Sequence, residues 1–104
     1  MADKRIDFYI GLGDKETGKM EDKEAFKKRL ADFFTSKKIP FHFSDLIGGY
    51  VYNDSSYIIE DSLKLTIIGD YSKERIKAFV DVIKSNYSQE SILVNEKEIK
   101  MNYE

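Results

Sequence analysis

The sequence predicts an α+β fold whose elements follow the order β-α-β-β-α-β. Two observations lead to this fold class. Apolar and polar residues alternate near both ends of the chain and in two stretches of its middle, which is typical of strands with one buried face. Two further segments carry apolar residues every three or four positions, which is typical of amphipathic helices. Elements in this order form a ferredoxin-like sandwich, an antiparallel sheet with both helices on one face.

The composition indicates a single domain that covers residues 1–104. The chain is 41% hydrophobic and 13% aromatic and has one proline, whereas disordered chains are poor in apolar and aromatic residues. A chain of this length buries roughly 60–70% of its extended surface on folding. We therefore expect a fold that needs no disulfide or metal to stabilise it.

The first third of the chain predicts a strand, a loop and a helix. Alternation over residues 6–12 predicts the first strand, and glycines break the pattern over residues 11–19. Asp22 is a suitable N-cap for the helix that follows. Pro40 ends this segment, because proline disfavours helical geometry at the residue before it. The apolar stripe of the helix, at i, i+4, i+7 and i+8, consists of Phe26, Leu30, Phe33 and Phe34.

The middle of the chain predicts a hairpin of two strands. Residues 41–52 are aromatic and β-branched, but Ser44-Asp45 and Gly48-Gly49 predict a loop or bulge before or within this strand. Residues 53–56 favour a turn, and residues 57–68 predict a long third strand.

The last third predicts a helix and a strand. Ser72 is a suitable cap for the second helix, whose stripe consists of Ile76, Phe79, Val80, Ile83 and Tyr87. Residues 91–95 predict the fourth strand. Alternation at Ile99, Met101 and Tyr103 predicts a short extra strand toward the C-terminus.

Several classes of function are excluded or disfavoured by composition. The chain has no cysteine, which excludes disulfides, thiolate zinc sites and cysteine nucleophiles. One histidine excludes a histidine cluster for metal, and we expect neither a metal nor a cofactor. A net charge of −2 disfavours nucleic acid as the main partner. Since no apolar run approaches the roughly 18 residues of a membrane span, we expect a cytoplasmic protein.

Three loops converge at one end of the predicted fold. The ferredoxin-like order places the first strand between the third and the fourth, so residues 11–19, 53–56 and 88–91 share that end. These loops form either a binding site or, as the alternative, ordinary polar loops that are exposed to solvent and bind nothing. The candidate ligand- or partner-binding residues are Gly11, Gly13, Asp14, Lys15, Thr17, Lys19, Gln89, Glu90 and Ser91.

The first loop matches part of a phosphate-binding motif. Gly13 to Lys19 fits G-x-x-x-x-G-K, but Met20 stands where a P-loop needs Ser or Thr to hold magnesium. The loop is also acidic, and an antiparallel sheet is the wrong scaffold for a P-loop. A weaker alternative remains, in which Gly11, Gly13 and the helix N-terminus bind an anion with Lys15 or Lys19.

Other polar residues favour structural roles. His42, the single histidine, is flanked by aromatic residues and is expected to be partly buried rather than a general base. Glu60 and Asp61 are adjacent on a strand, so they point to opposite faces and cannot pair as acid and base. We expect one of them to form a salt bridge with a lysine of the first helix. These patterns identify no catalytic residue.

Tyrosines are frequent on three neighbouring strands. A sheet with helices on one face leaves the other face open, and aromatic residues there either stack bases or pack against another subunit. No basic aromatic motif accompanies them, so we favour self-association as a homodimer. The candidate interface residues are Tyr9, Tyr50, Tyr52 and Tyr57.

Three stretches carry a resemblance to known proteins: residues 9–17, residues 49–63 and residues 89–94. They read YIGLGDKET, GYVYND with IEDSL, and QESILV. This chain resembles short uncharacterised proteins encoded by phages and conjugative elements of Gram-positive bacteria. Gly13 departs from the Asn expected in such proteins. The resemblance implies a mobile-element accessory protein without an established activity, so no catalytic residue is carried over.

Two functional hypotheses follow. The first is a small non-enzymatic binding protein of a phage or mobile element that binds a host or element-encoded macromolecule, for instance to inhibit a host defence system. The second is a small-molecule or nucleotide binder, or a weak phosphodiesterase, that uses the 11–19 loop with Glu90 and Ser91. A structural subunit without a ligand is a third reading.

Overall fold

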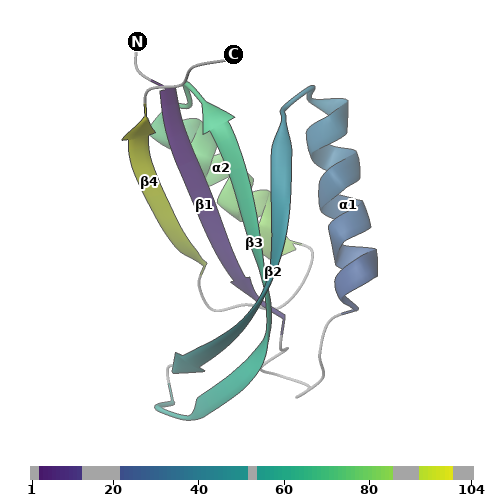
Figure 1. The fold of residues 1–104 in the computed structure, drawn as a ribbon, viewed down its shortest axis with the longest axis vertical. Coiled ribbons are helices and arrows are strands. Elements are labelled where there is room, and N and C mark those ends of the chain that lie inside the picture. Colours follow the sequence, from purple (N-terminus) through teal and green to yellow (C-terminus); the bar gives the residue numbers. More distant parts are fainter. Residues whose placement is uncertain (1–2, 13–21, 52–53, 86–91, 100–104) are drawn as a thin grey trace.

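The computed structural model describes residues 3–12, 22–51, 54–85 and 92–99. Four strands form one antiparallel sheet in the order β2-β3-β1-β4 (Figure 1). This arrangement confirms the predicted βαββαβ sandwich, with β1 between β3 and β4. The elements are β1 (Asp3–Gly11), α1 (Lys23–Ser36), β2 (Phe41–Val51), β3 (Tyr57–Gly69), α2 (Lys73–Ser85) and β4 (Leu93–Ile99).

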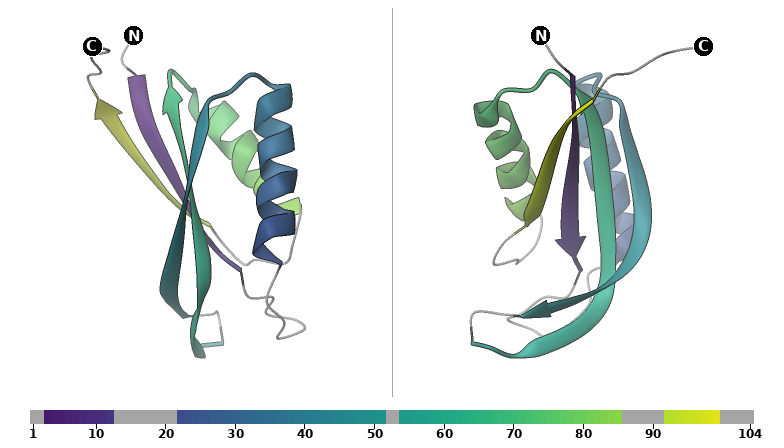
Figure 2. Two further views of the ribbon diagram at one scale, coloured as in Figure 1. Left: turned by 45° about the vertical axis from the view of Figure 1, so that its right-hand side comes forward. Right: turned by 60° about the vertical axis from the view of Figure 1, so that its left-hand side comes forward.

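The hydrophobic core lies between the helices and one face of the sheet (Figure 2). Alternate residues of β1 and β3, such as Ile6, Phe8 and Leu65, are fully buried there. The predicted helix stripes supply the other layer, with Leu30 and Phe79 among the buried residues. We call the face of the sheet that the helices leave uncovered the open face.

Both helices begin at the predicted caps. The Asp22 carboxylate accepts hydrogen bonds from the backbone N–H groups of Glu24 and Ala25 at 3.1 and 3.2 Å. The Ser72 hydroxyl accepts one from the N–H of Arg75 at 3.2 Å. Such side chains satisfy N–H groups that lack a partner within the helix. Neither helix has the length and apolar character that a membrane span requires within the described part of the chain.

The strands β2 and β3 form an unbroken ribbon. Their register runs without interruption from Phe41 opposite Ile67 to Val51 opposite Tyr57. The predicted loop or bulge at Ser44-Asp45 or Gly48-Gly49 is therefore wrong, because glycine also adopts the extended backbone of a paired strand. The turn that joins the strands is stabilised by Asp54, whose carboxylate accepts hydrogen bonds from the N–H and hydroxyl of Ser56.

Part of this ribbon extends beyond the rest of the sheet. Gly11, the last residue of β1, pairs with Ser62, and the Leu12 N–H donates to the Asp61 carbonyl. Among the described strands, residues 57–61 of β3 then pair with residues 47–51 of β2 alone. We call these two segments the arm. The arm curves away below β1 and β4 (Figures 1 and 2).

The last strand is longer than predicted. β4 begins at Leu93 and pairs with β1 as far as Ile99, opposite Asp3. Ile99, assigned above to an extra strand, thus belongs to β4 itself. Met101 and Tyr103 lie outside the described residues, so the extra strand stays a prediction.

Candidate functional site

The elements that bound the predicted loops lie at one end of the molecule. The end of β1, the start of α1, the start of β4 and the arm all occupy this end (Figure 1). Gly11 is buried in the sheet there. The other candidate binding residues lie outside the described residues and stay predictions: Gly13, Asp14, Lys15, Thr17, Lys19, Gln89, Glu90 and Ser91.

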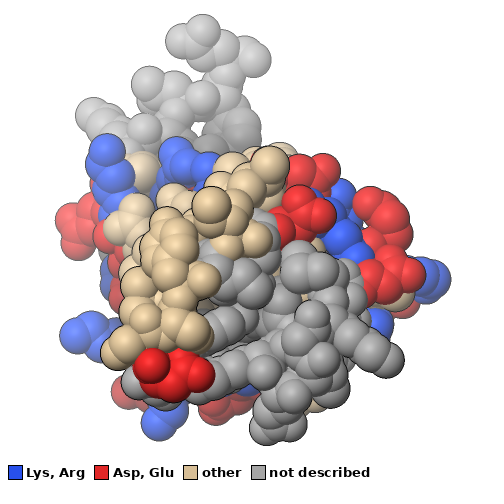
Figure 3. Space-filling model, turned by 90° about the horizontal axis from the view of Figure 1, so that it is seen from below, with Lys and Arg blue, Asp and Glu red and all other residues tan. Residues whose placement is uncertain are grey.

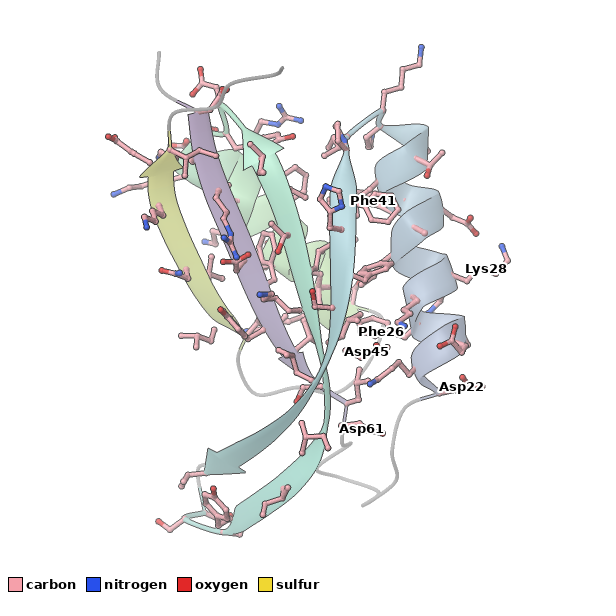
Figure 4. All side chains as sticks on the ribbon, in the orientation of Figure 1. Asp22, Phe26, Lys28, Phe41, Asp45 and Asp61 are labelled. Atoms are coloured by element: carbon pink, nitrogen blue, oxygen red, sulfur yellow. The ribbon has the colours of Figure 1, made fainter. Side chains whose placement is uncertain are left out.

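The described residues form an open hollow at this end. It has a volume of about 530 Å³, and its lining residues are Lys23, Asp45, Leu46, Ile47 and Asp61. The helix α1 contributes the lysine, and β2 and β3 contribute the rest at the base of the arm. Asp45 lies between β2 and α1, and Asp61 lies below it (Figure 4). The hollow thus combines two carboxylates, an ammonium group and an apolar wall.

An ion-pair network joins β2 to α1 at the hollow. The Lys27 ammonium lies 2.9 Å from Asp45 Oδ1, and the Lys23 ammonium lies 3.5 Å from the same oxygen. The hydrogen bond from Lys27 lowers the pKa of Asp45 and, reciprocally, raises the pKa of Lys27. Asp45 is therefore ionised at neutral pH, and two lysines share its charge.

This network corrects one prediction from the sequence. Among the described side chains, the carboxylate that pairs with the lysines of α1 is Asp45 and not Asp61. The side chain of Glu60, the other residue expected to do so, lies outside the described ones, so that part stays a prediction. Lys23 and Lys27 are four residues apart and therefore share one face of the helix. The register places Asp45 opposite Leu63, on the helix-facing side of the ribbon. The lysine spacing was visible in the sequence, but its partner depended on a strand that had been predicted to be interrupted.

The tyrosines do not gather on the open face as predicted. Tyr9 pairs with Lys64, on the open face. Tyr57 has the same alternation as the core residues Leu63 and Leu65 of its strand, so it lies on the opposite, helix-facing side. Tyr50 pairs with Ile58, whereas Tyr9 pairs with Lys64, six residues further along β3. Six residues of strand place the two tyrosines roughly 20 Å apart. Tyr52 lies outside the described residues.

The open face carries a buried carboxylate. Asp7 is 3% exposed, and its Oδ1 accepts a hydrogen bond from the Thr66 hydroxyl at 2.6 Å. The Arg5 guanidinium lies 3.2 Å from Asp7 Oδ2. A buried charge is costly unless it is paired and hydrogen-bonded, and both conditions are met here. This group is therefore fully engaged by its own sheet.

His42 pairs with Thr66 at the outer edge of this face. Its side chain is exposed, so the expectation of a partly buried histidine is wrong. The aromatic neighbours Phe41 and Phe43 point to the helices, and alternation turns His42 the other way. Within the described residues no group of three or more His, Cys, Asp or Glu side chains could hold a metal ion.

Two comparisons by sequence find no match. No protein-family model matches the chain, and no curated protein matches it. Comparison of structures, by contrast, finds several similar folds.

One similar structure is a phage SAM lyase in complex with S-methyl-5'-thioadenosine, with a TM-score of 0.72 and 20% identity over 93% of this chain and 81% of the other. Another is the GlnK–ATP complex of B. subtilis, with a TM-score of 0.60 and 10% identity over 94% and 82%. A third is CutA1 from Oryza sativa, with a TM-score of 0.59 and 18% identity over 98% and 85%. These likenesses establish the fold.

Proposed function

We propose that this chain is a small binding protein of a phage or mobile element and that its ligand contains an adenosine unit. The observation that supports the ligand is shared by two structures with the same fold. The phage SAM lyase holds S-methyl-5'-thioadenosine, and GlnK holds ATP. Both ligands contain adenosine, although the two proteins are named for different roles. The phage origin of the lyase agrees with the mobile-element resemblance of the sequence.

The hollow at the base of the arm has suitable chemistry for such a ligand. Its volume of about 530 Å³ lies within the range of about 300–1,000 Å³ typical of small-molecule sites. Leu46 and Ile47 offer apolar surface to a base. The Asp61 carboxylate can accept hydrogen bonds from ribose hydroxyls, as acidic residues do in dinucleotide sites. Lys23 supplies a cation for an anionic substituent.

The proposed activity is binding without a chemical step. The described residues of the hollow include no nucleophile beside a base, which covalent catalysis requires. The predicted alternative, a weak phosphodiesterase that uses the 11–19 loop with Glu90 and Ser91, depends on residues outside the described part of the chain. It stays a prediction.

Calorimetric titration tests the ligand. We expect S-methyl-5'-thioadenosine or ATP to bind and the matched guanosine compounds to bind more weakly. The substitution Asp61→Ala should weaken binding at least about tenfold, equivalent to about 1.4 kcal/mol. Asp32→Ala is the control, because Asp32 pairs only with Lys28 in the described structure, on the exposed side of α1.

Two results would count against this proposal. If no adenosine compound binds, the ligand class is wrong. If an adenosine compound binds equally well to the wild type and to Asp61→Ala, the ligand lies elsewhere than in the hollow. A control variant that also loses binding would instead indicate a general loss of structure, which circular dichroism would detect.

A host or element-encoded protein is the second candidate partner, and binding it could inhibit a host defence system. The observation that favours a protein partner is the exposure of large apolar side chains, which often marks protein–protein contacts. These side chains are Ile47, Val51, Tyr57, Ile59 and Leu93. Native mass spectrometry of the protein isolated from its host would detect such a complex. A protein that carries only nucleoside-sized masses would favour the first candidate.

A further inference from the structure

The arm exposes a continuous apolar surface. Ile47, Val51, Tyr57 and Ile59 are between 67% and 78% exposed. Alternation places all four on the same side of the ribbon as the core residues Leu63 and Leu65. Figure 3 views the molecule from this end and shows a band of uncharged side chains next to acidic and basic groups. The apolar face of β2 and β3 thus continues beyond the helices that cover its other half.

A two-stranded ribbon of this kind gains little stability by itself. Isolated hairpins are marginally stable in water, and a third strand or a packed layer is needed to hold them. Within the arm, the Tyr57 ring lies over Gly49, where a Cβ atom would collide with its hydroxyl. This contact still leaves Tyr57 67% exposed. The arm therefore has a preformed apolar face that its own strands leave largely exposed.

The charge of the arm restricts what can cover it. The arm and the turn that joins its strands, residues 47–61, include three acidic residues, Asp54, Glu60 and Asp61, and no lysine or arginine. Asp61 shares the apolar face, since it pairs with Ile47. A suitable partner surface combines apolar contact area with an excess of basic groups.

The open face of the sheet has that character. Arg5, Lys64 and Lys97 lie on it by register. The acidic residues that share this face by register are Asp3, Asp7 and Glu60, and Glu60 lies on the arm. Asp7 pairs with Arg5 and accepts a hydrogen bond from Thr66, so on the body of the face Lys64 and Lys97 stand against Asp3 alone. Tyr9 and Leu93 stand opposite each other on the same face and add apolar area, with Leu93 66% exposed.

We propose that the arm of one copy of this chain docks on the open sheet face of a second copy. The apolar face of the arm covers Tyr9 and Leu93, and its Asp61 carboxylate faces the basic groups of the sheet. Because the arm and the open face are different parts of the chain, two copies can exchange arms across a two-fold axis, or each copy can dock on the next in a ring or filament. A homodimer through the tyrosines, as predicted, would instead bring two open faces together.

Sedimentation equilibrium of the purified protein tests this contact. We expect a mass above the 12.1 kDa of one chain. Ile59→Lys places a cation at the centre of the apolar face and should weaken association at least about tenfold. Its control is Ala78→Lys, which adds the same charge at an exposed position of α2. Circular dichroism confirms that both variants are folded.

A charge exchange tests the partner surface. Lys64→Glu on the open face should weaken association, whereas Lys77→Glu, on an exposed site of α2, should not. Adding Asp61→Lys to Lys64→Glu should restore part of the lost association. A photo-crosslinker that replaces Tyr57 should join two copies through peptides from β1, β3 or β4.

Some outcomes would overturn the proposal. One is a wild-type protein that remains a single chain throughout the micromolar range. Another is a single chain whose arm is covered by a host protein. A third is an oligomer that Ile59→Lys leaves intact. The last outcome combines two results: the charge exchange fails to rescue association, and the crosslinks are confined to the arm of the second copy. These results would show an arm-to-arm dimer in place of the proposed contact.

Discussion

The two halves of the β2–β3 ribbon have the same alternation but different surroundings. In the upper half, Leu65 is fully buried beneath the helices, and Phe43 packs against the core. In the arm, Ile47 and Ile59 continue the same face and are 78% and 70% exposed. Alternation therefore determines the direction of a side chain, whereas the neighbouring layer determines whether that side chain is buried. An apolar face without such a layer is the surface that our proposal assigns to contact with a second copy.

The largest expected difference is between two truncations on this face. Leu65→Ala should lower the free energy of unfolding by about 2–5 kcal/mol, because it removes buried contacts and leaves a cavity. Ile59→Ala should change it by no more than about 0.5 kcal/mol, because the side chain is already exposed. Urea titration at a concentration where the chain is single measures both. Equal losses would show that the arm is packed in the isolated chain and would invalidate the comparison.

Two glycines allow the same comparison between the packed half of the ribbon and the arm, with smaller expected losses of stability. A Cβ atom at Gly69 would lie 2.8 Å from the ring of Tyr71, which is 7% exposed and cannot move aside. Gly69→Ala should therefore destabilise the fold by about 1–3 kcal/mol.

The matching change in the arm should cost much less. In Gly49→Ala the new methyl group meets the hydroxyl end of Tyr57, which is exposed and can rotate away. We expect a loss below about 1 kcal/mol and a change in tyrosine fluorescence as the ring leaves the ribbon. A larger loss for Gly49→Ala than for Gly69→Ala would contradict this ranking.

The smallest effect concerns the ion pair at the base of the arm. The pKa of Asp45 is lowered from 3.8. The stability that the ionised Asp45 adds to the folded state is therefore present above that value and is lost as the pH falls through the lowered pKa. The pKa of Lys27 is raised from 10.5. The stability that the protonated Lys27 adds to the folded state is therefore present below that value and is lost as the pH rises through the raised pKa.

Melting curves of the wild type and Asp45→Asn test this pair. The difference in Tm should be greatest near neutral pH and should shrink in acid and in strong base. It should also fall as salt is added, because exposed ion pairs are screened. Lys28→Ala, which breaks the exposed pair with Asp32, provides a comparison on α1. A Tm difference for Asp45→Asn that does not vary with pH would assign the effect to packing.

Much of the fold could be predicted from the sequence because its periods are clear. The alternation of β1 and the stripe of α2 result from burial on one face, and the caps Asp22 and Ser72 act through local hydrogen bonds. Gly48-Gly49 misled the prediction, since glycine is compatible with both a break and a paired strand. The conformation of β2 was decided by its long-range pairing with β3.

The candidate site was less predictable for a related reason. The end of the molecule that holds the hollow was predicted from topology, but its described lining is Lys23, Asp45, Leu46, Ile47 and Asp61. Asp45 meets Lys27 only through the register of β2 against β3 and the packing of α1. The position of Tyr57 likewise depends on a register that extends through the arm without interruption. Local patterns contain neither piece of information.

The unbroken register also constrains how the arm can change in length. Inserting or deleting one residue in either strand would turn every side chain beyond it to the other face. Adding or removing two residues in each strand would preserve both faces while changing the reach of the arm. Natural or engineered versions of this chain can therefore vary how far they extend toward a partner in steps of about 6–7 Å, with the body of the sheet left unchanged.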